Sequence, residues 1–579
     1  MAKSHLDFAE HGLLRPELFI GVLSNVTAQN VRFNVSSAGS PSATHYKGGR
    51  YGRGEVGEFV LIEGQVTHLL GRIVELRLPE RDRRSVNPGI PPRDDLDAIG
   101  TIQLLGSVAM DSLCVTAGVQ AYPRLGDRVY SAPHQLLSRL PSLMEADGAK
   151  PPDVLLTLGT IDVAKDSAIA IKPEKLFGRH CAIIGATGGG KSWTTARVIE
   201  ECIKHKAKLI LLDATGEYRG LTGQTVLSWH LGSPPGSFAY GPNHRASLPP
   251  SSFLESDLVA MFEPAGRVQG PKLREAIRSL KLAGLEPGLA INGCIVKLRK
   301  LKQDIHDAEL RHASALDNPE TPFDVSKLPD QIRNECVFPD GGTQANPDAT
   351  RWGGEAVNDY NYCLGLITRV IAITRSSTFD FIFRHIGNPL YEKFEQFVAA
   401  PDRRLLRVCL GGVSHEYKAR EIVANVIGRK LLSLARQGKF LDAPLVVIVD
   451  EAHSFLGRQI GSEDTVAKLD AFELIAKEGR KYGLNICLAT QRPRDITEGV
   501  LSQMGTLIVH RLTNDQDREV VERACGEIDR AAASFLPTLR PGEAAIIGAE
   551  FPIPLTIQMI PPDTKPKSDG PDYQSKWRV

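Results

Sequence analysis

A glycine-rich segment in the first half of the chain has the residue types and the spacing of a phosphate-binding loop. Gly185-Ala-Thr-Gly-Gly-Gly-Lys191-Ser192 fits G-x-x-x-x-G-K-[ST], follows an apolar run and precedes a segment with helical periodicity. The glycines let backbone N–H groups turn towards phosphates, the lysine neutralises the β and γ charges, and the serine hydroxyl can ligate Mg²⁺. The segment predicts a site for ATP and Mg²⁺, formed by Gly185, Gly188, Gly189, Gly190, Lys191, Ser192 and Trp193. The alternative is a glycine-rich turn that contains a lysine by chance.

A second segment ends in two acidic residues after a run of strand-forming residues. Leu445-Val-Val-Ile-Val is followed by Asp450 and Glu451, and the carboxyl ends of parallel strands meet at the nucleotide-binding edge of a sheet. We expect Asp450 to hold Mg²⁺ through water, and Glu451 to orient and deprotonate the attacking water. The alternative is an exposed acidic strand end that caps a helix. For His453, a structural role is the favoured interpretation.

Further polar residues follow or precede predicted strands of the same sheet. Gln491 follows the strand 484–490 and is a candidate sensor of the γ-phosphate, while Arg480 is a candidate arginine finger. A solvated basic face at the end of a helix is the alternative for Arg480. Asp213 and Glu217 follow the strand KLILL, where they could position Mg²⁺ or couple hydrolysis to movement. A turn in which Asp213 caps a helix is the alternative there.

The elements that must position these residues alternate between buried strands and helices. Apolar runs that alternate with helical periodicity are typical of a parallel sheet covered on both faces. We expect the core strands at 181–184, 208–212, 405–410, 445–450, 484–490 and 506–510. The fold class is therefore an α/β P-loop ATPase core, expected to occupy residues 151–250 and 400–560.

Three other regions flank or interrupt this core. Short alternating apolar runs between residues 18 and 130, separated by Gly and Pro, predict a small β-barrel; residues 1–150 are expected to hold this barrel and a linker. Helical periodicity over 251–399 predicts a helical insertion, including a helix through INGCIVKLRKLKQDIHDAEL. The last segment, 561–579, is polar and is expected to be a tail.

The insertion also holds a basic run, formed by Lys297, Arg299, Lys300 and Lys302. Such a run could meet phosphate, but a solvated helix face is the favoured interpretation. Over the whole chain, 69 Lys and Arg against 68 Asp and Glu give a net charge of +1, so no global field would draw it onto a polyanion. Any nucleic-acid site must therefore be local.

The sequence carries no export signal that we recognise. The N-terminal segment lacks the apolar run of a secretory signal, and no window approaches 18 uncharged apolar residues. The nine cysteines are scattered and never form a C-x-x-C pair, which is typical of reduced, buried thiols. A cytoplasmic protein is expected. The free use of Cys, Asn and Gln favours a mesophile.

Together these segments resemble the HerA family of hexameric DNA-translocating ATPases, which are relatives of FtsK and of conjugative secretion ATPases. The resemblance is carried by GATGGGKS, LILLDATGEY, VVIVDEAH, EGRKYGLNICLATQRP, HRLTNDQD and LRPGEAAIIG. It implies a RecA/FtsK-like core, an N-terminal barrel of the HerA type, and a homo-hexamer with DNA through its central channel. It also implies that Arg480 reaches a neighbouring subunit's γ-phosphate, and that Arg179 contacts nucleotide. A plain surface arginine is the alternative for Arg179.

The resemblance further implies a partner protein. Family members act with a nuclease partner. In bacteria, nuclease or sirtuin-like effectors are encoded beside the family member in phage (antiviral) defence. The mesophile-like composition favours a bacterial member. The function expected is that of a helicase-like DNA translocase, and the alternative is an ATPase scaffold that assembles and activates an effector. A protein-translocating secretion ATPase is disfavoured because no membrane anchor is found.

Overall fold

The computed structural model describes residues 12–35, 44–46, 49–78, 98–110, 113–144, 153–161, 164–233, 244–343, 346–384, 387–456, 469–524, 535–567 and 573–578. The chain divides into two compact units. The first holds Met1–His205, Thr490–Arg494 and Leu501–Lys565, and the second holds Lys206–Ala489, Asp495–Val500 and Pro566–Val579. The linker expected near residues 145–152 lies outside the described residues.

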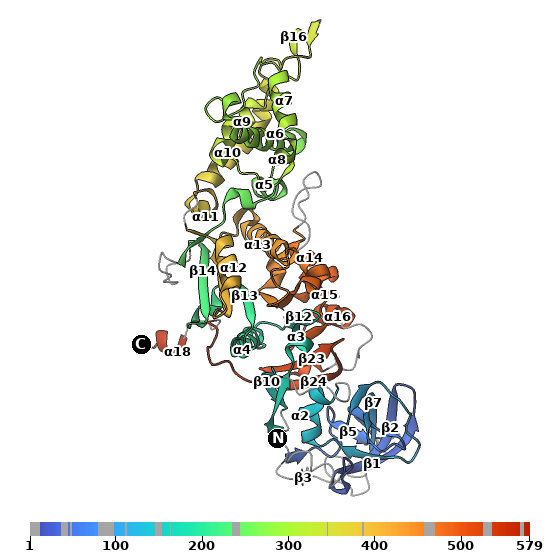
Figure 1. Cartoon of the computed structure of the whole chain (residues 1–579). Helices are drawn as coiled ribbons and strands as arrows, with labels where there is room; N and C mark the ends of the chain where they lie inside the picture. The colour runs from blue at the N-terminus through green and yellow to red at the C-terminus, as the bar shows by residue number, and fades with distance from the viewer. Residues whose placement is uncertain are drawn as a thin grey trace. The chain divides into compact units, whose positions relative to one another are not determined.

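A closed barrel of six antiparallel strands is part of the first unit, drawn in blue in Figure 1. Its strands pair in the order β2-β1-β9-β5-β6-β7, and β7 pairs back with β2. In β2 every second residue is buried, because Val31, Phe33 and Val35 face the barrel core while their neighbours face solvent. The predicted barrel is confirmed. Its strands are β1 (Phe19–Val26), β2 (Asn30–Val35), β5 (Phe59–Ile62), β6 (Thr67–Arg77), β7 (Ala98–Ala109) and β9 (Arg128–Ser131).

The first unit also contains a mixed sheet with the strand order β11-β10-β24-β23-β22-β12. Among the described residues of this sheet, β12 and β22 pair in parallel, and β22–β23, β23–β24, β10–β24 and β10–β11 pair antiparallel. Helix α4 (Lys191–Ile203) packs against β10 and β12. The strands are β10 (Leu156–Ile161), β11 (Ala164–Ile171), β12 (Cys181–Ile184), β22 (Thr506–Val509), β23 (Glu543–Gly548) and β24 (Phe551–Met559).

The second unit contains five parallel strands in the order β21-β20-β13-β19-β14. All residues of β13 are buried, as expected for a parallel strand covered on both faces. The strands expected at 445–450 and 484–490 are therefore confirmed as neighbours in one sheet. The strands are β13 (Lys208–Asp213), β14 (Val226–Gly232), β19 (Leu405–Gly412), β20 (Leu445–Val449) and β21 (Leu484–Thr490). Helix α12 (Leu390–Ala399) precedes β19, α13 (Ala419–Arg436) lies between β19 and β20, and α14 (Ala471–Glu478) lies between β20 and β21.

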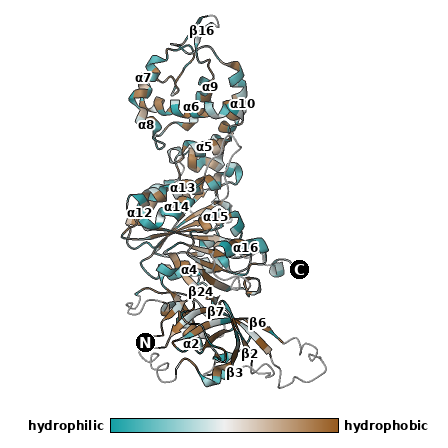
Figure 2. Ribbon diagram, turned by 90° about the vertical axis from the view of Figure 1, so that its right-hand side faces the viewer, coloured by the Kyte–Doolittle hydropathy of each residue, from teal (hydrophilic) through white to brown (hydrophobic). Residues whose placement is uncertain are grey.

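A helical region follows β14 in the second unit, drawn in green and yellow in Figure 1. Its helices show alternating hydrophilic and hydrophobic bands in Figure 2, as expected of helices that bury one face. A two-stranded hairpin, β16 (Gly341–Thr343) with β17 (Asn346–Asp348), interrupts it. The helices are α5 (Glu255–Phe262), α6 (Gly266–Leu285), α7 (Gln303–Arg311), α8 (Ala313–Asp317), α9 (Leu328–Asn334), α10 (Val357–Arg375) and α11 (Asp380–Phe383).

The helical periodicity of INGCIVKLRKLKQDIHDAEL corresponds to a helix only in the second part of that segment. Residues 291–302 are irregular, and α7 begins only at Gln303. Asn292, Gly293 and Arg299 have positive φ values of 53°, 80° and 55°, which a right-handed helix does not accommodate. The Gln331 side chain bonds both the N–H and the carbonyl of Ile295, at 2.8 and 2.9 Å, in place of helical partners.

The basic run is consequently not on a helix face. The side chain of Lys297 is mostly buried and forms an ion pair with Glu335, which is fully buried. Lys302 pairs with Asp340 at 2.8 Å. The helix in the favoured interpretation of this run is wrong, because tertiary contacts override the local periodicity. Arg299 and Lys300 are nevertheless exposed to solvent, as a solvated run requires. Among the described residues, no helix is both long enough and apolar enough to span a bilayer.

Candidate functional site

The phosphate-binding loop connects β12 to α4 within the first unit. Gly188 and Gly190 have φ values of 76° and 114°, in a region where a Cβ atom costs roughly 1–2 kcal/mol. Lys191 is the first residue of α4 and is only 4% exposed. The loop thus leads into a helix start, where backbone N–H groups lack intrahelical partners and the helix dipole is positive. This is the local geometry of an anion-binding site.

A buried histidine, His510, supports this loop from the residue after β22. Its Nδ1 lies 2.8 Å from the carbonyl oxygen of Glu543, so we assign the proton to Nδ1, and Nε2 accepts from the Thr194 hydroxyl at 2.8 Å. A Cβ atom at Gly185 would lie 2.7 Å from the Cβ atom of His510, so only glycine allows this close approach. Burial lowers the pKa of His510 to about 4. The loop is therefore backed by a neutral imidazole of fixed tautomer.

Three other predicted nucleotide-site residues lie in the first unit. Gln491 Oε1 accepts a hydrogen bond of 2.6 Å from Thr187, which places its side chain on the phosphate-binding loop. Trp193 lies in the first turn of α4, and its ring centroid is 5.7 Å from the Lys565 ammonium. Arg179 precedes β12, at the end opposite the loop, and pairs with Glu550 at 3.2 Å. The structure brings Gln491 and Trp193 to the loop within this unit, but not Arg179.

The two acidic residues predicted after the run Leu445-Val-Val-Ile-Val, Asp450 and Glu451, follow β20 in the second unit. Asp450 is fully buried, its N–H donates to the Leu212 carbonyl at 3.1 Å, and its Oδ1 accepts from the Tyr218 hydroxyl at 3.4 Å. Glu451 has φ 47° and ψ 44°, a left-handed conformation that is uncommon for glutamate. Such conformations cluster at active sites and ligand clamps. His453 lies 3.3 Å from the Glu451 carboxylate through Nδ1.

The two acidic residues after β13 differ in their surroundings. Asp213 is fully buried and accepts hydrogen bonds from the N–H groups of Gly216 and Tyr218, at 2.7 and 3.3 Å. It also pairs with Arg407 Nε at 2.7 Å. Glu217 is different, because its Oε2 is buried and has no hydrogen-bond partner among the described residues. Asp213 thus holds a turn, while Glu217 keeps a carboxylate oxygen for another partner.

Arg480 lies in the second unit, in the short helix η11 (Gly479–Tyr482) that follows α14. Arg480 is exposed to solvent, whereas Gly479 before it is buried. Gly483, at φ 73°, ends this helix and leads into β21. The arginine is therefore presented to solvent on a short, firmly anchored element, which suits a residue that reaches another molecule.

Each unit, taken by itself, offers groups that suit a magnesium nucleotide. The loop offers helix-start N–H groups and a buried lysine to phosphates, and Ser192 lies in the first turn of α4. In the second unit, Asp450 supplies a buried carboxylate, and hard oxygen ligands are what Mg²⁺ requires. Bound nucleotide would supply the phosphoanhydride bond, and the chain supplies the groups that hold it and activate water.

Three contributing residues were missed by the sequence analysis. His510 belongs to the motif HRLTNDQD and Tyr218 to the motif LILLDATGEY, but neither residue was predicted to have a role of its own. Arg407 carried a usable signal, because it is a charged residue inside an otherwise apolar strand segment, LLRVCL. A charge at such a position is rarely buried without a partner. That signal predicts a buried acid nearby, which is Asp213.

Comparison with known proteins shows the following similarities. Residues 156–327 match the family model described as "Helicase HerA, central domain". The "DNA double-strand break repair helicase HerA" of Pyrococcus furiosus is 34% identical over 469 residues, which cover 80% of this chain and 77% of that protein. The "Probable DNA double-strand break repair helicase HerA" of Methanocaldococcus jannaschii is 32% identical over 428 residues, covering 70% and 76%. Among solved structures, the bacterial conjugative coupling protein TrwBdeltaN70 has a TM-score of 0.43 and 13% identity, covering 75% of this chain and 92% of that one.

Proposed function

Because the chain belongs to the HerA family, we propose that it is an ATP-driven, ring-forming motor that translocates DNA. The relatives reported above are named as DNA double-strand break repair helicases. The observation that carries the proposal is the phosphate-binding loop itself, with Lys191 buried at the start of α4 and His510 fixed behind the glycines. The chain is an ATP hydrolase, with ATP and Mg²⁺ as its cofactors.

Each predicted site residue has a role in this proposal. Lys191 binds the β- and γ-phosphates, and Ser192 and Asp450 hold Mg²⁺. Glu451 accepts the proton of the attacking water. The remaining glycines of the loop direct N–H groups at phosphate.

Other residues have more specific roles. Gln491 is the γ-phosphate sensor, and its contact with Thr187 supports this assignment. Arg480 is the finger that acts on a neighbouring subunit, which its exposure supports. Of the two coupling candidates, Glu217 is favoured over Asp213, whose carboxylate already holds a turn. Trp193 and Arg179 are proposed to contact the nucleotide, Arg179 on the family resemblance alone.

The assembly is proposed to be a cytoplasmic homo-hexamer with DNA in its central channel. An effector, either a nuclease or a sirtuin-like protein, is proposed to act with it, and phage defence is the proposed setting if the chain is bacterial. Both relatives reported above are archaeal, so bacterial origin stays a prediction. The domain limits given from the sequence likewise remain proposals.

The test is whether DNA and ATP turnover depend on each other. Purified wild-type protein should hydrolyse ATP faster with duplex DNA, and should displace a third strand from a triplex substrate only when ATP is present. Lys191→Ala is the control that should do neither. DNA affinity should fall with salt, with a slope of about −0.9 per phosphate neutralised.

The scaffold function makes the opposite prediction. If ATP is hydrolysed, yet DNA changes neither turnover nor binding and no strand is displaced, the ATPase serves assembly of an effector instead. A wild-type protein with no ATP turnover at all would remove both functions.

A further inference from the structure

We infer that Tyr218 is a positioning residue for the Mg²⁺-binding carboxylate of Asp450, and that the Asp213–Arg407 pair holds Tyr218 in place. This inference rests on the proposed function, since it concerns the same ATPase site. All four residues lie in the second unit, on or directly after β13, β19 and β20.

The inference starts from the turn that follows β13. Asp213 is the last residue of that strand, and its two carboxylate oxygens accept the N–H groups of Gly216 and Tyr218. Gly216 has φ 83°, so the chain reverses there through a left-handed residue. One side chain thus fixes the path of the backbone from the end of the strand to Tyr218.

Arg407 fixes the carboxylate that organises this turn. It lies on β19, which pairs in parallel with β13 and places Arg407 opposite Leu211. Its Nε is 2.7 Å from Asp213 Oδ2, and the side chains of the two residues are 1% and 0% exposed. Because a buried guanidinium without its anion is strongly unfavourable, neither partner can rotate away without loss of stability. The turn is therefore anchored to two neighbouring strands of the sheet.

Tyr218 connects this turn to Asp450, which directly follows β20. Its side chain is fully buried, at 1% exposure, and its hydroxyl donates to Asp450 Oδ1 at 3.4 Å. The Asp450 backbone N–H donates to the carbonyl of Leu212, so β13 and the short helix after its turn, Glu217–Gly220, each hold Asp450 at one point. A hydroxyl that engages one oxygen of a carboxylate fixes its orientation towards metal, as partners of metal ligands commonly do. The bond is long, so its effect is expected at the lower end of the usual range.

Tyr218→Phe separates this role from simple packing, because it keeps the ring and removes only the hydroxyl. We expect the Mg²⁺ concentration for half-maximal binding of a non-hydrolysable ATP analogue, and that for half-maximal ATP turnover, to rise about tenfold. Tenfold is the lower limit of what loss of such a partner usually costs. Turnover at saturating Mg²⁺ should fall less. Mn²⁺ has the same charge as Mg²⁺ and also favours octahedral oxygen ligands, so a parallel Mn²⁺ titration should show the same defect if it lies in metal binding.

A matched control is available in the same unit. Tyr391 also has a long hydroxyl contact, 3.5 Å to the Val426 carbonyl, but it does not contact Asp450. Tyr391→Phe should leave the Mg²⁺ dependence at the wild-type value. The melting temperature of each variant in EDTA shows whether it is folded. If one variant is less stable, both Mg²⁺ titrations are carried out well below the melting temperature of that variant, so that the comparison concerns folded protein.

The outcomes are distinct. A raised Mg²⁺ requirement in Tyr218→Phe alone supports the inference. A wild-type Mg²⁺ requirement in Tyr218→Phe, or the same rise in Tyr391→Phe, overturns it and leaves the ATPase function intact. Wild-type protein without ATP turnover would instead overturn the proposed function.

Discussion

Two buried ion pairs in the second unit show how one physical device serves different purposes. Arg407 and Asp213 join two strands of the parallel sheet. Lys297 and Glu335 join an irregular segment of the insertion to the end of α9. In both pairs the acid is fully buried and its partner comes from a distant part of the sequence.

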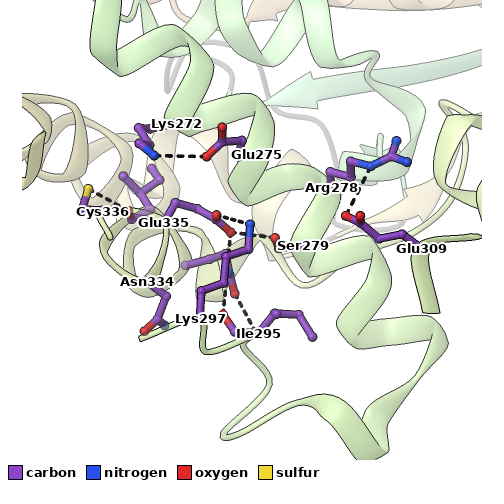
Figure 3. Close-up of polar contacts among 12 residues, drawn as sticks. Lys272, Glu275, Arg278, Ser279, Ile295, Lys297, Glu309, Asn334, Glu335 and Cys336 are labelled. Carbon is purple, nitrogen blue, oxygen red and sulfur yellow. Dashed lines mark hydrogen bonds and ion pairs between the residues drawn. The ribbon is translucent and has the colours of Figure 1, made fainter. Parts of the chain in front are cut away.

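The difference lies in what the acid contacts next. Asp213 holds the turn that places Tyr218 against Asp450. Glu335 accepts hydrogen bonds from Ser279 and Gln331, at 2.6 and 2.8 Å. Figure 3 shows Ser279 and Lys297 pointing towards Glu335. Gln331 also bonds the backbone of Ile295, which is part of the insertion. A buried charge therefore marks a rigid place, and the groups it positions decide whether that rigidity bears on chemistry.

The largest contrast should be in turnover. Lys191→Ala is expected to abolish ATP hydrolysis, because the γ-phosphate loses the charge that the loop positions. Lys297→Met should leave turnover within about twofold of wild type, because Lys297 contacts only the insertion's own residues among those described. Steady-state ATPase rates measure both. Near-normal turnover in Lys191→Ala would refute the assignment of the phosphate-binding loop.

The next prediction asks whether an exposed charge can matter as much as a buried one. Arg480→Ala should bind ATP and form rings, while turnover falls by a factor on the order of 10³ or more. Mixing it with Lys191→Ala should restore measurable turnover, because some interfaces then join an intact loop to an intact arginine. If mixing restores nothing although native mass spectrometry shows mixed rings, either Arg480 acts within its own subunit or every site must be intact.

The sequence was most informative where one local pattern determines the structure. The run Leu445–Val449 is apolar throughout, so no other element suits it, and the spacing from Gly185 to Ser192 determines a loop before a helix. It was least informative where distant groups compete with local periodicity. Ile295 lies in a helical pattern, yet the Gln331 side chain satisfies its backbone from 36 residues away. Likewise, nothing near Tyr218 in the sequence shows that its hydroxyl meets Asp450, 232 residues later.

The two ion pairs should also differ in stability. Asp213→Asn removes a carboxylate that is paired with the buried Arg407 and should cost about 3–5 kcal/mol. Lys297→Met should cost less, roughly 1–3 kcal/mol, because Glu335 keeps the hydrogen bonds of Ser279 and Gln331. Denaturant midpoints followed by circular dichroism compare the two. Equal losses would mean that the neutral donors around Glu335 contribute little.

The last prediction concerns a buried group that remains neutral instead of pairing with a charge. Burial lowers the pKa of His510 to about 4, from an ordinary value of 6.5. Above pH 6.5 the imidazole is neutral in both folded and unfolded chains, and its stability contribution is fully present. As pH falls from 6.5 to 4, only the unfolded chain gains the proton, so stability is lost progressively. The total loss from this group is about 3 kcal/mol, from the pKa difference and 1.36 kcal/mol per unit.

Removing the imidazole isolates this contribution from that of other titrating groups. His510→Gln cannot gain the proton in this range, so its free energy of unfolding should fall less steeply between pH 6.5 and 4 than that of the wild type. Its stability at neutral pH can be lower, because the contacts with Thr194 and Glu543 change, but only the slope is compared. His312→Gln, which alters a partly exposed histidine of the insertion beside Glu286, is the matched histidine control. An unchanged slope in His510→Gln would mean that the imidazole takes up its proton in the folded protein too, and that the loop tolerates a cation behind its glycines.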